Sequence, residues 1–349
     1  MDNGAGPAGR LMAVARAARA SGADRDEHAY WALVAEAVQG DSGQGVLRCG
    51  LSLLESADSL EREVGCDLVA NAADRHESLR GGAATALMAL AEAETRVGVL
   101  RSLVVGLGRT QDPRAVPALV RFSRHENADV RGRAAAAIGS ANSGRPDGAD
   151  VHALIRLTRD QDPDVRNWAT FTLGCQLEHD TADIRAALWA RATDEDGEVR
   201  QEAARGLARR HDPRALPLVA RLLEAADGPQ VFLVEAAEVL GAPELLPALH
   251  AYCEHDPDGT DRAIAACDPV QRARIEGEAW TVVVELERLC PGVGAALDSP
   301  RHESVHHLQV TVRGAAEAAA DAVYDAASLL ARADGNPTRA AELVLADLV

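Results

Sequence analysis

The 349-residue chain contains no lysine, so all 36 of its Lys and Arg positions are arginine. Lysine forms Schiff bases and binds nucleotide phosphates in P-loops, so enzyme classes that depend on those reactions are excluded. Two interpretations of the absence stay open. One is the composition of a GC-rich genome of actinobacterial type. The other is an escape from lysine-directed modification or degradation tagging.

Aromatic residues make up only 3% of the chain, although 47% of its residues are hydrophobic. Alanine supplies much of the apolar fraction, which predicts helices that pack closely through small side chains. No run approaches the roughly 18 apolar residues that a membrane span requires. The N-terminal stretch carries arginines inside its apolar part and lacks the uninterrupted core of a secretory signal. We therefore expect a cytoplasmic protein with no membrane association.

Positive charge is also scarce, because 54 acidic residues against 36 basic ones leave a net charge of −18. This excess argues against a nucleic-acid-binding surface, which requires clustered positive charge. It favours a protein partner that carries basic groups. The six cysteines show no C-x-x-C spacing, and we expect them to be reduced and mostly buried. They are Cys49, Cys66, Cys175, Cys253, Cys267 and Cys290.

A recurring tripeptide, Asp/Glu-Val-Arg, is the main positive signal. It begins at Asp129, Asp164 and Glu198, at steps of 35 and 34 residues, and each copy opens an alanine-rich apolar stretch. A second pattern, D-P-R-A-[VL]-P, begins at Asp112 and again at Asp212. Self-similarity at this period indicates stacked helix pairs, each of which buries its apolar face against the next.

These residues resemble the HEAT repeat family, particularly the short bacterial subtype named after phycobilisome-lyase accessory subunits. The patterns are D-P-x-A-[VL]-P-x-L for the first helix and D-x-D-V-R-x-x-A-x-x-x-[IL]-G for the second, and they are clear over residues 110–245. The resemblance implies an all-α fold, a right-handed α-solenoid (superhelix) of stacked antiparallel helix pairs. We expect a leader and capping helices in 1–44, six or seven repeats in 45–268, and a helical C-terminal cap in 269–349.

The charged residues of the tripeptide have a structural interpretation. We expect Asp129, Asp164 and Glu198 to cap helix N-termini, where a carboxylate binds free N–H groups and meets the positive end of the dipole. Arg131, Arg166 and Arg200 are expected to reach carboxylates of the neighbouring repeat, which would produce a ladder of ion pairs.

Helical spacing also predicts a partner-binding face. Each repeat valine and the residues four and eight positions after it are expected to form a buried core stripe, and the positions three and six after the valine point away from it. The second helices line the concave side, where solenoids bind extended partners. Aromatic anchors dominate interface energetics, so Trp168 and Phe171 stand out; alternatively, they fill a gap between adjacent repeats. The predicted partner-binding residues are Arg133, Trp168, Phe171, Glu202, Arg205, Glu235 and Glu238.

One motif has the form of an enzyme site. His302, Glu303 and His306 match H-E-x-x-H, which on a helix places two histidines on one face as zinc ligands, with a glutamate as general base. The motif follows Pro300, has no clear third ligand, and repeats the R-H-E element found at Arg75 and Arg124. We interpret it as a turn into a helix and expect neither a cofactor nor a metal. A metal-dependent enzyme or lyase-type accessory subunit that uses these His-Glu segments is the alternative.

Two HEAT-like enzymes provide further comparisons. Deoxyhypusine hydroxylase holds two irons through His-Glu pairs that directly follow the Val-Arg position. Here those positions hold Gly132-Arg133, Asn167-Trp168 and Gln201-Glu202, so the iron ligands are missing. Alkylpurine glycosylases need a cationic groove, which the acidic composition of this chain does not favour.

The C-terminal part is predicted to be helical. One long helix is expected to end near Pro291, and a second to run from Glu303 to about Arg332, with a heptad-like seam that includes Val305, Leu308 and Val312. This seam either caps the solenoid or forms a homodimer. The last segment resembles the first helix of a Fis-type helix-turn-helix, but the plainer interpretation is a small helical hairpin with its turn at Gly335 and Asn336. Taken together, the sequence predicts a non-catalytic scaffold or adaptor that binds a protein or peptide as a monomer or homodimer.

Overall fold

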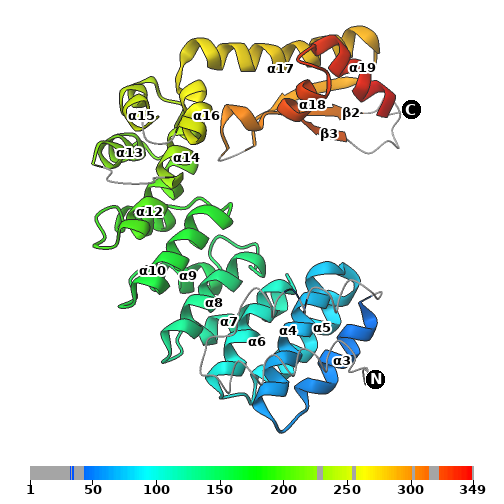
Figure 1. Ribbon diagram of the computed structural model, residues 1–349, viewed down its shortest axis with the longest axis vertical. Helices are drawn as coiled ribbons and strands as arrows, with labels where there is room; N and C mark the ends of the chain where they lie inside the picture. The colour runs from blue at the N-terminus through cyan, green and yellow to red at the C-terminus, as the bar shows by residue number, and fades with distance from the viewer. Residues whose placement is uncertain are drawn as a thin grey trace, which may run out of the picture. The chain divides into compact units, whose positions relative to one another are not determined.

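The computed structural model describes residues 32, 34, 43–225, 231–253, 257–300, 303–313 and 322–347. These residues are mostly helical and divide into two compact units, Met1–Ala187 (unit 1) and Leu188–Val349 (unit 2) (Figure 1). The expected leader and capping helices in 1–44 lie almost wholly outside the described residues. Within them, no helix is long and apolar enough to span a bilayer.

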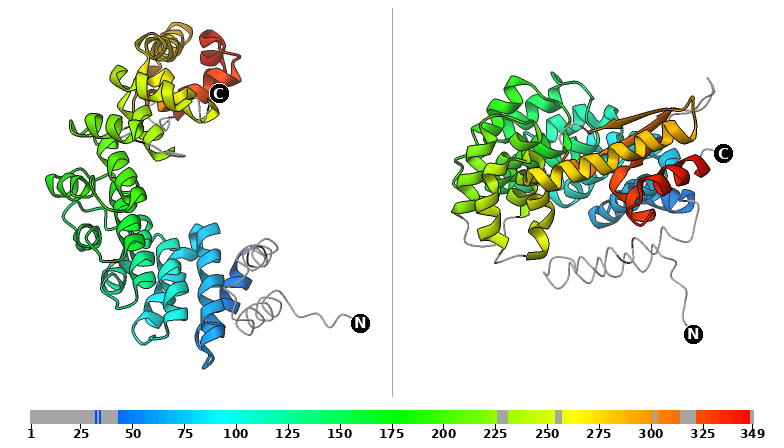
Figure 2. Two further views of the ribbon diagram at one scale, coloured as in Figure 1. Left: turned by 60° about the vertical axis from the view of Figure 1, so that its left-hand side comes forward. Right: turned by 90° about the horizontal axis from the view of Figure 1, so that it is seen from above.

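The described residues of unit 1 form four successive helix pairs. The second helix of each pair packs against that of the next, so α4, α6, α8 and α10 form a continuous layer, which the views in Figure 2 also show. The pairs are α3 (Gln44–Leu54) with α4 (Ser59–Arg75), α5 (Arg80–Ala91) with α6 (Val97–Arg109), α7 (Val116–Phe122) with α8 (Ala128–Ser140), and α9 (Ala149–Leu157) with α10 (Pro163–Phe171). Short turns, η1 (Glu77–Leu79) and η2 (Pro113–Ala115), precede α5 and α7, and a π-helical turn, η3 (Thr172–Gln176), extends α10.

The core of the repeats follows the predicted stripe. Each repeat valine and the residues four and eight positions after it are essentially inaccessible to solvent, which confirms the prediction. These residues are Val130, Ala134 and Ile138, then Val165, Ala169 and Leu173, then Val199, Ala203 and Leu207. Small residues allow the close crossings: a β-carbon on Gly108 of α6 would lie only 2.9 Å from the Cα of Ala137 on α8.

Unit 2 continues the helix pairs and then changes architecture. Its second helices, α12, α14 and α16, pack in sequence, and α16 leads into α17. The elements are α11 (Ala182–Trp189), which spans the boundary between units, α12 (Gly197–Arg209), α13 (Ala215–Glu224), α14 (Val231–Leu240), η4 (Pro243–Leu245), α15 (Leu246–Cys253), α16 (Pro257–Cys267) and α17 (Pro269–Leu289).

The C-terminal part contains a sheet that the sequence analysis did not predict. The long helix expected before Pro291 is present as α17, but the second helix, from Glu303 to about Arg332, is not formed in the described residues. They form instead β1 (Gly294–Asp298), η5 (Val305–His307), β2 (Gln309–Arg313), β3 (Ala322–Asp325), α18 (Ala326–Arg332) and α19 (Pro337–Asp347). The sheet is antiparallel in the order β1-β2-β3.

Side-chain alternation explains the strands. In β2, Val310 and Val312 are fully buried while their neighbours are partly or fully exposed, and β-branched residues favour a pleated, half-buried surface. They form a core of their own with α17, α18 and α19, including Val282, Leu286 and Leu329. The expected second long helix, with its heptad-like seam, is therefore wrong. The final hairpin, by contrast, is present, and its turn includes Gly335 at φ 73°.

Candidate interaction surface

The second helices begin at side-chain caps that lie two residues before the Asp or Glu of the tripeptide. Asn127 accepts a hydrogen bond from Val130 N–H, Asp162 from Asp164 and Val165, and Asp196 from Glu198 and Val199. Such caps satisfy N–H groups that the helix itself leaves unpaired. The expectation that Asp129, Asp164 and Glu198 are the caps is thus wrong by two residues. They lie in the first turn, where a carboxylate still meets the helix dipole favourably.

The repeat arginines hold the loops between paired helices. Arg131 Nη1 donates to the carbonyl oxygens of His125 and Glu126, six and five residues earlier. Arg166 makes the same pair of bonds to Asp160 and Gln161, and Arg200 to Asp194 and Glu195. One guanidinium per repeat therefore satisfies two loop carbonyls that no helix could pair.

Arg131 also reaches the next repeat, as predicted. Its Nε and Nη2 each lie 2.8 Å from one oxygen of the Asp160 carboxylate, and both side chains are about nine-tenths buried. Burial by itself raises the pKa of Asp160. The hydrogen bonds from Arg131 and from the N–H of Asp162 outweigh this effect and hold the pKa below its ordinary value.

Arg62 forms an earlier copy of this arrangement, which the search for Asp/Glu-Val-Arg did not predict. Arg62 donates to the carbonyls of Ser56 and Ala57 and, through Nε, to Glu94 of the following repeat at 2.7 Å. It stands four residues after its helix cap, Asp58, just as Arg131 follows Asn127. The signal was therefore available as D-S-L-E-R, where the arginine keeps its distance from the cap but a glutamate replaces the valine.

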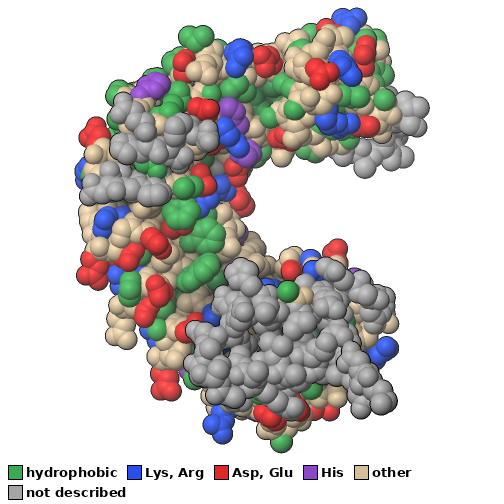
Figure 3. All heavy atoms as spheres, in the orientation of Figure 1, with side chains coloured by type: hydrophobic (Ala, Val, Ile, Leu, Met, Phe, Trp, Pro, Cys, Tyr) green, Lys and Arg blue, Asp and Glu red, His purple; other side chains and the backbone are tan. Residues whose placement is uncertain are grey.

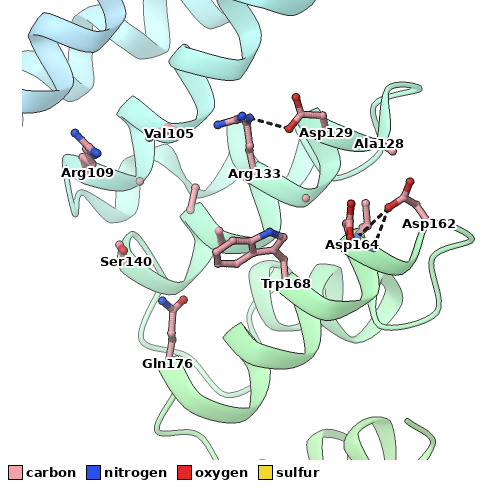
Figure 4. A pocket seen from close by; sticks show the side chains of 15 residues that line it. Val105, Arg109, Ala128, Asp129, Arg133, Ser140, Asp162, Asp164, Trp168 and Gln176 are labelled. Carbon is pink, nitrogen blue, oxygen red and sulfur yellow. Dashed lines mark hydrogen bonds and ion pairs between the residues drawn. The ribbon is translucent and has the colours of Figure 1, made fainter. Parts of the chain in front are cut away.

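A groove of about 910 Å³ follows the second helices of unit 1 (Figure 4). Its floor consists of small residues, which include Gly132, Ala136 and Ala137. Arg133 and Trp168, two of the predicted partner-binding residues, line it. We call this cavity, between α6, α8, α10 and η3, the unit 1 groove.

Trp168 is the largest apolar group in the unit 1 groove, and 47% of its surface is exposed. It meets Phe171 edge to face, with ring centroids 6.0 Å apart, but Phe171 itself is only partly exposed and does not line the groove. A tryptophan that filled a gap between alanine-rich helices would be mostly buried. The exposure of the indole therefore favours the open-face interpretation for Trp168.

Charge in the unit 1 groove is mixed. Arg133 Nε donates to Asp129 Oδ1 at 2.9 Å, one turn earlier on α8, while Asp162 and Asp164 line the side where α10 begins. On the molecular face in Figure 3, arginine and acidic side chains are likewise interspersed.

The remaining predicted residues belong to unit 2 and are less open than expected. Glu202 is only 3% exposed, so its predicted place on an open face is wrong. Neighbouring side chains cover it, and Arg205 lies 3.7 Å from its carboxylate. Arg205 pairs more closely with Glu235, at 2.6 Å. Glu238 binds Arg262 and also Ser304, which belongs to the C-terminal part of the chain.

The H-E-x-x-H segment lies on this same face of unit 2. His302 falls outside the described residues. Glu303 pairs with Arg209 at 3.1 Å, and the Nε2 of His306 lies 3.0 Å from the carbonyl oxygen of Arg262. The segment is an extended stretch followed by a short 3-10 turn, not the start of a long helix, and no group of three His, Cys, Asp or Glu side chains with metal-binding geometry occurs in the described part of the chain.

Comparison with known proteins identifies the repeats. A sequence profile of HEAT repeats matches residues 84–174 and 151–241. The structure is similar to that of YibA from Escherichia coli, with 22% identity over 74% of this chain and 90% of the other and a TM-score of 0.53.

Two weaker similarities have lower scores. The CpcE–CpcF complex of phycocyanin lyase from Nostoc has 19% identity over 63% of this chain and 92% of that chain, with a TM-score of 0.40. Human deoxyhypusine hydroxylase has 16% identity over 75% and 96%, with a TM-score of 0.30. A search of curated proteins found no match. The profile and the stacked helix pairs agree, and residues 84–241 therefore consist of HEAT repeats.

Proposed function

We propose that this protein is a non-catalytic scaffold that binds an extended segment of a partner protein in the unit 1 groove. HEAT solenoids are typical of protein-interaction scaffolds, and their stacked second helices offer an extended binding surface. The observation that carries the proposal is the half-exposed indole of Trp168 on the wall of a groove floored by glycine and alanine. Trp is enriched among the residues that contribute most to binding energy.

The partner is proposed to be a protein or peptide with basic groups. The chain carries a net charge of −18, and Asp162 and Asp164 line the unit 1 groove beside Trp168. An apolar side chain of the partner would pack on the indole while an arginine or lysine beside it meets these carboxylates. We place this interaction in the cytoplasm, without nucleic acid or membrane.

The test uses the wild-type chain and two single variants as baits in a lysate of the source cells. Trp168→Ala is expected to lower the affinity for the partner roughly thirty-fold, which is the usual effect of removing an interface hot spot. Trp189→Ala is the matched control, because Trp189 is 40% exposed but lies outside the unit 1 groove. Equal capture of the same proteins by all three baits would refute the proposal.

The melting temperature separates binding from folding. Because Trp168 is half exposed, its loss is expected to lower the melting temperature by no more than a few degrees. A much larger drop would mean that the indole supports the packing of α8 against α10, which is the other interpretation of its position.

A further inference from the structure

A second cavity, of about 350 Å³, lies over the second helices of unit 2. Arg205 and Arg209 of α12, Glu238 of α14 and Arg262 of α16 line it. Glu303, Ser304 and His307, from the segment Glu303–His307 that precedes β2, form another part of its wall. We call the surface of α12, α14 and α16 around this cavity the unit 2 groove. It is built from the same kind of helix, the second of each pair, as the unit 1 groove.

The segment binds the unit 2 groove through side chains on its first two residues. Glu303 Oε1 accepts a hydrogen bond from Arg209 Nη1 at 3.1 Å. Ser304 Oγ donates to Glu238 Oε1 at 2.7 Å, and Ser304 is only 2% exposed. Its backbone is extended, with φ −81° and ψ 170°. A carboxylate followed by a hydroxyl on extended backbone is therefore recognised by an arginine and a glutamate on neighbouring helices.

The histidines that follow bind α16. Arg262 Nη2 lies 2.9 Å from Glu238 Oε1 and 3.0 Å from His307 Nε2. His306 Nε2 lies 3.0 Å from the carbonyl oxygen of Arg262. Arg262 thus contacts His307 at the end of the segment, and it also pairs with Glu238, the glutamate that binds Ser304. After His307, Leu308 enters the separate core of the C-terminal sheet and helices.

We infer that the unit 2 groove is a peptide-binding site which the chain fills with its own segment Glu303–His307. The partner that fits it is an extended segment in which a carboxylate is followed by a hydroxyl, and it binds by displacing Glu303 and Ser304. This inference rests on the proposed function in one respect, because both assume that the second helices of the solenoid bind partner segments.

Displacement is physically reasonable because the contacts between the segment and the groove are partly open to water. Glu303, which pairs with Arg209, is one-third exposed, and Arg262, which contacts His307, is more than half exposed. Polar pairs that are open to water contribute little to stability. The internal segment is favoured over a free peptide because it is part of the same chain, which gives it a high effective concentration at the groove. A partner that repeats the same contacts and adds others along the groove overcomes that advantage.

The experiment measures binding of a fluorescein-labelled peptide, Glu-Ser-Val-His-His-Leu, to the full chain by anisotropy. In the variant Glu303→Ala/Ser304→Ala the internal competitor loses its anchors, and the peptide is expected to bind about tenfold more tightly than to the wild type. Adding Arg209→Ala to that variant is expected to abolish the gain. Arg214→Ala is the matched control, because Arg214 is an exposed arginine of the same unit that does not line the groove.

Each alternative outcome is decisive. If the double variant retains its circular dichroism spectrum but binds no more peptide than the wild type, the segment is only a structural contact and the inference is wrong. If the wild type is a dimer by light scattering and the double variant a monomer, the occupant is the segment of a second copy, which also overturns it. Trp168→Ala is expected to leave peptide binding unchanged, so this inference and the proposed function succeed or fail separately.

Discussion

Arg131 binds both carboxylate oxygens of Asp160, which lies twenty-nine residues later, in the loop of the next repeat. The same guanidinium also holds the two carbonyls of its own loop. One side chain therefore connects a loop, a helix and the neighbouring repeat. In a solenoid, where each repeat contacts only its neighbours, a connection of this kind contributes directly to the interface between repeats.

Replacing Arg131 with alanine is expected to lower the free energy of unfolding by about 3 kcal/mol. It removes the ion pair of a largely buried carboxylate, which keeps only its hydrogen bond from the N–H of Asp162, and it removes the donor to two loop carbonyls. Urea unfolding followed by circular dichroism measures the change. Arg133→Ala provides the control, since Arg133 makes a more exposed pair with Asp129 one turn away and its loss should cost about 0.5 kcal/mol or less. Equal effects of the two variants would contradict the role assigned to Arg131.

Stability is expected to depend on Asp160 at acid pH. The pKa of Asp160 is lowered in the folded protein, chiefly by Arg131 acting against the effect of burial, whereas in the unfolded chain it is about 3.9. The stabilisation is therefore fully present above about pH 4 and is lost as pH falls through the lowered value. Asp160→Asn should flatten this acid limb when unfolding is measured between pH 3 and pH 7. An acid limb as steep in the variant as in the wild type would assign the loss of stability to other carboxylates.

The pair of Arg62 and Glu94 should behave as a member of the same ladder. A double-mutant cycle with Arg62→Ala and Glu94→Ala is expected to give a coupling energy of about 1–2 kcal/mol, because both side chains are largely buried. Arg121 and Glu92 form the matched control, as they also join residues of successive repeats but are far more exposed, and their coupling should be near zero. Coupling energies of the same size in both cycles would argue against a special role for Arg62.

The sequence determined the repeated part of the fold well. The valine and the residues four and eight positions later are buried in each repeat, because a period near 34 residues fixes the register of the helices and helical spacing then fixes the buried stripe. The caps could not be placed as accurately, since Asn127, Asp162 and Asp196 each stand two residues before a carboxylate, that of Asp129, Asp164 or Glu198. Both positions favour acidic groups near a helix N-terminus, and only the backbone geometry separates them.

The candidate site was predictable only in unit 1. Trp168 and Arg133 line a groove because their own repeat positions place them there. Glu202 follows the same spacing, yet neighbouring side chains, including Arg205, cover it. Contacts to Glu238 from Ser304 depend on a segment sixty-six residues away, and no local periodicity predicts a contact at that separation.

The cysteines offer a test of burial that is independent of stability. Only Cys66 and Cys267 are buried, and the other four are partly exposed, so the expectation of mostly buried thiols is wrong. Burial raises the pKa of Cys66 and raises that of Cys267 to about 11. At pH 8 only about one-thousandth of Cys267 would be thiolate, which is the reactive form. Titration with a thiol reagent should therefore show two slow groups, and Cys267→Ala should remove one of them; loss of a fast group would contradict the assignment.

The C-terminal sheet and the long helix that the heptad spacing suggested make opposite predictions for Val310. In a helix with its seam at Val305, Leu308 and Val312, Val310 would lie on the opposite, solvent-facing side. In β2 it is fully buried and pairs with Leu297 of β1 and Tyr324 of β3. Val310→Asp should therefore cost about 3 kcal/mol or more and release the C-terminal core.

Val323→Asp is the control, because Val323 of β3 is 55% exposed and its replacement should cost less than about 1 kcal/mol. Hydrogen exchange then locates the effect. Faster exchange in α17 and α19, which share a core with Val310, should accompany Val310→Asp while the repeats of unit 1 stay protected. If the protein tolerates an aspartate at position 310, the helical interpretation is favoured instead of the strand. On a strand, residues 308, 310 and 312 face the same side, whereas on a helix the side chain at 310 faces water while Leu308 and Val312 face the core.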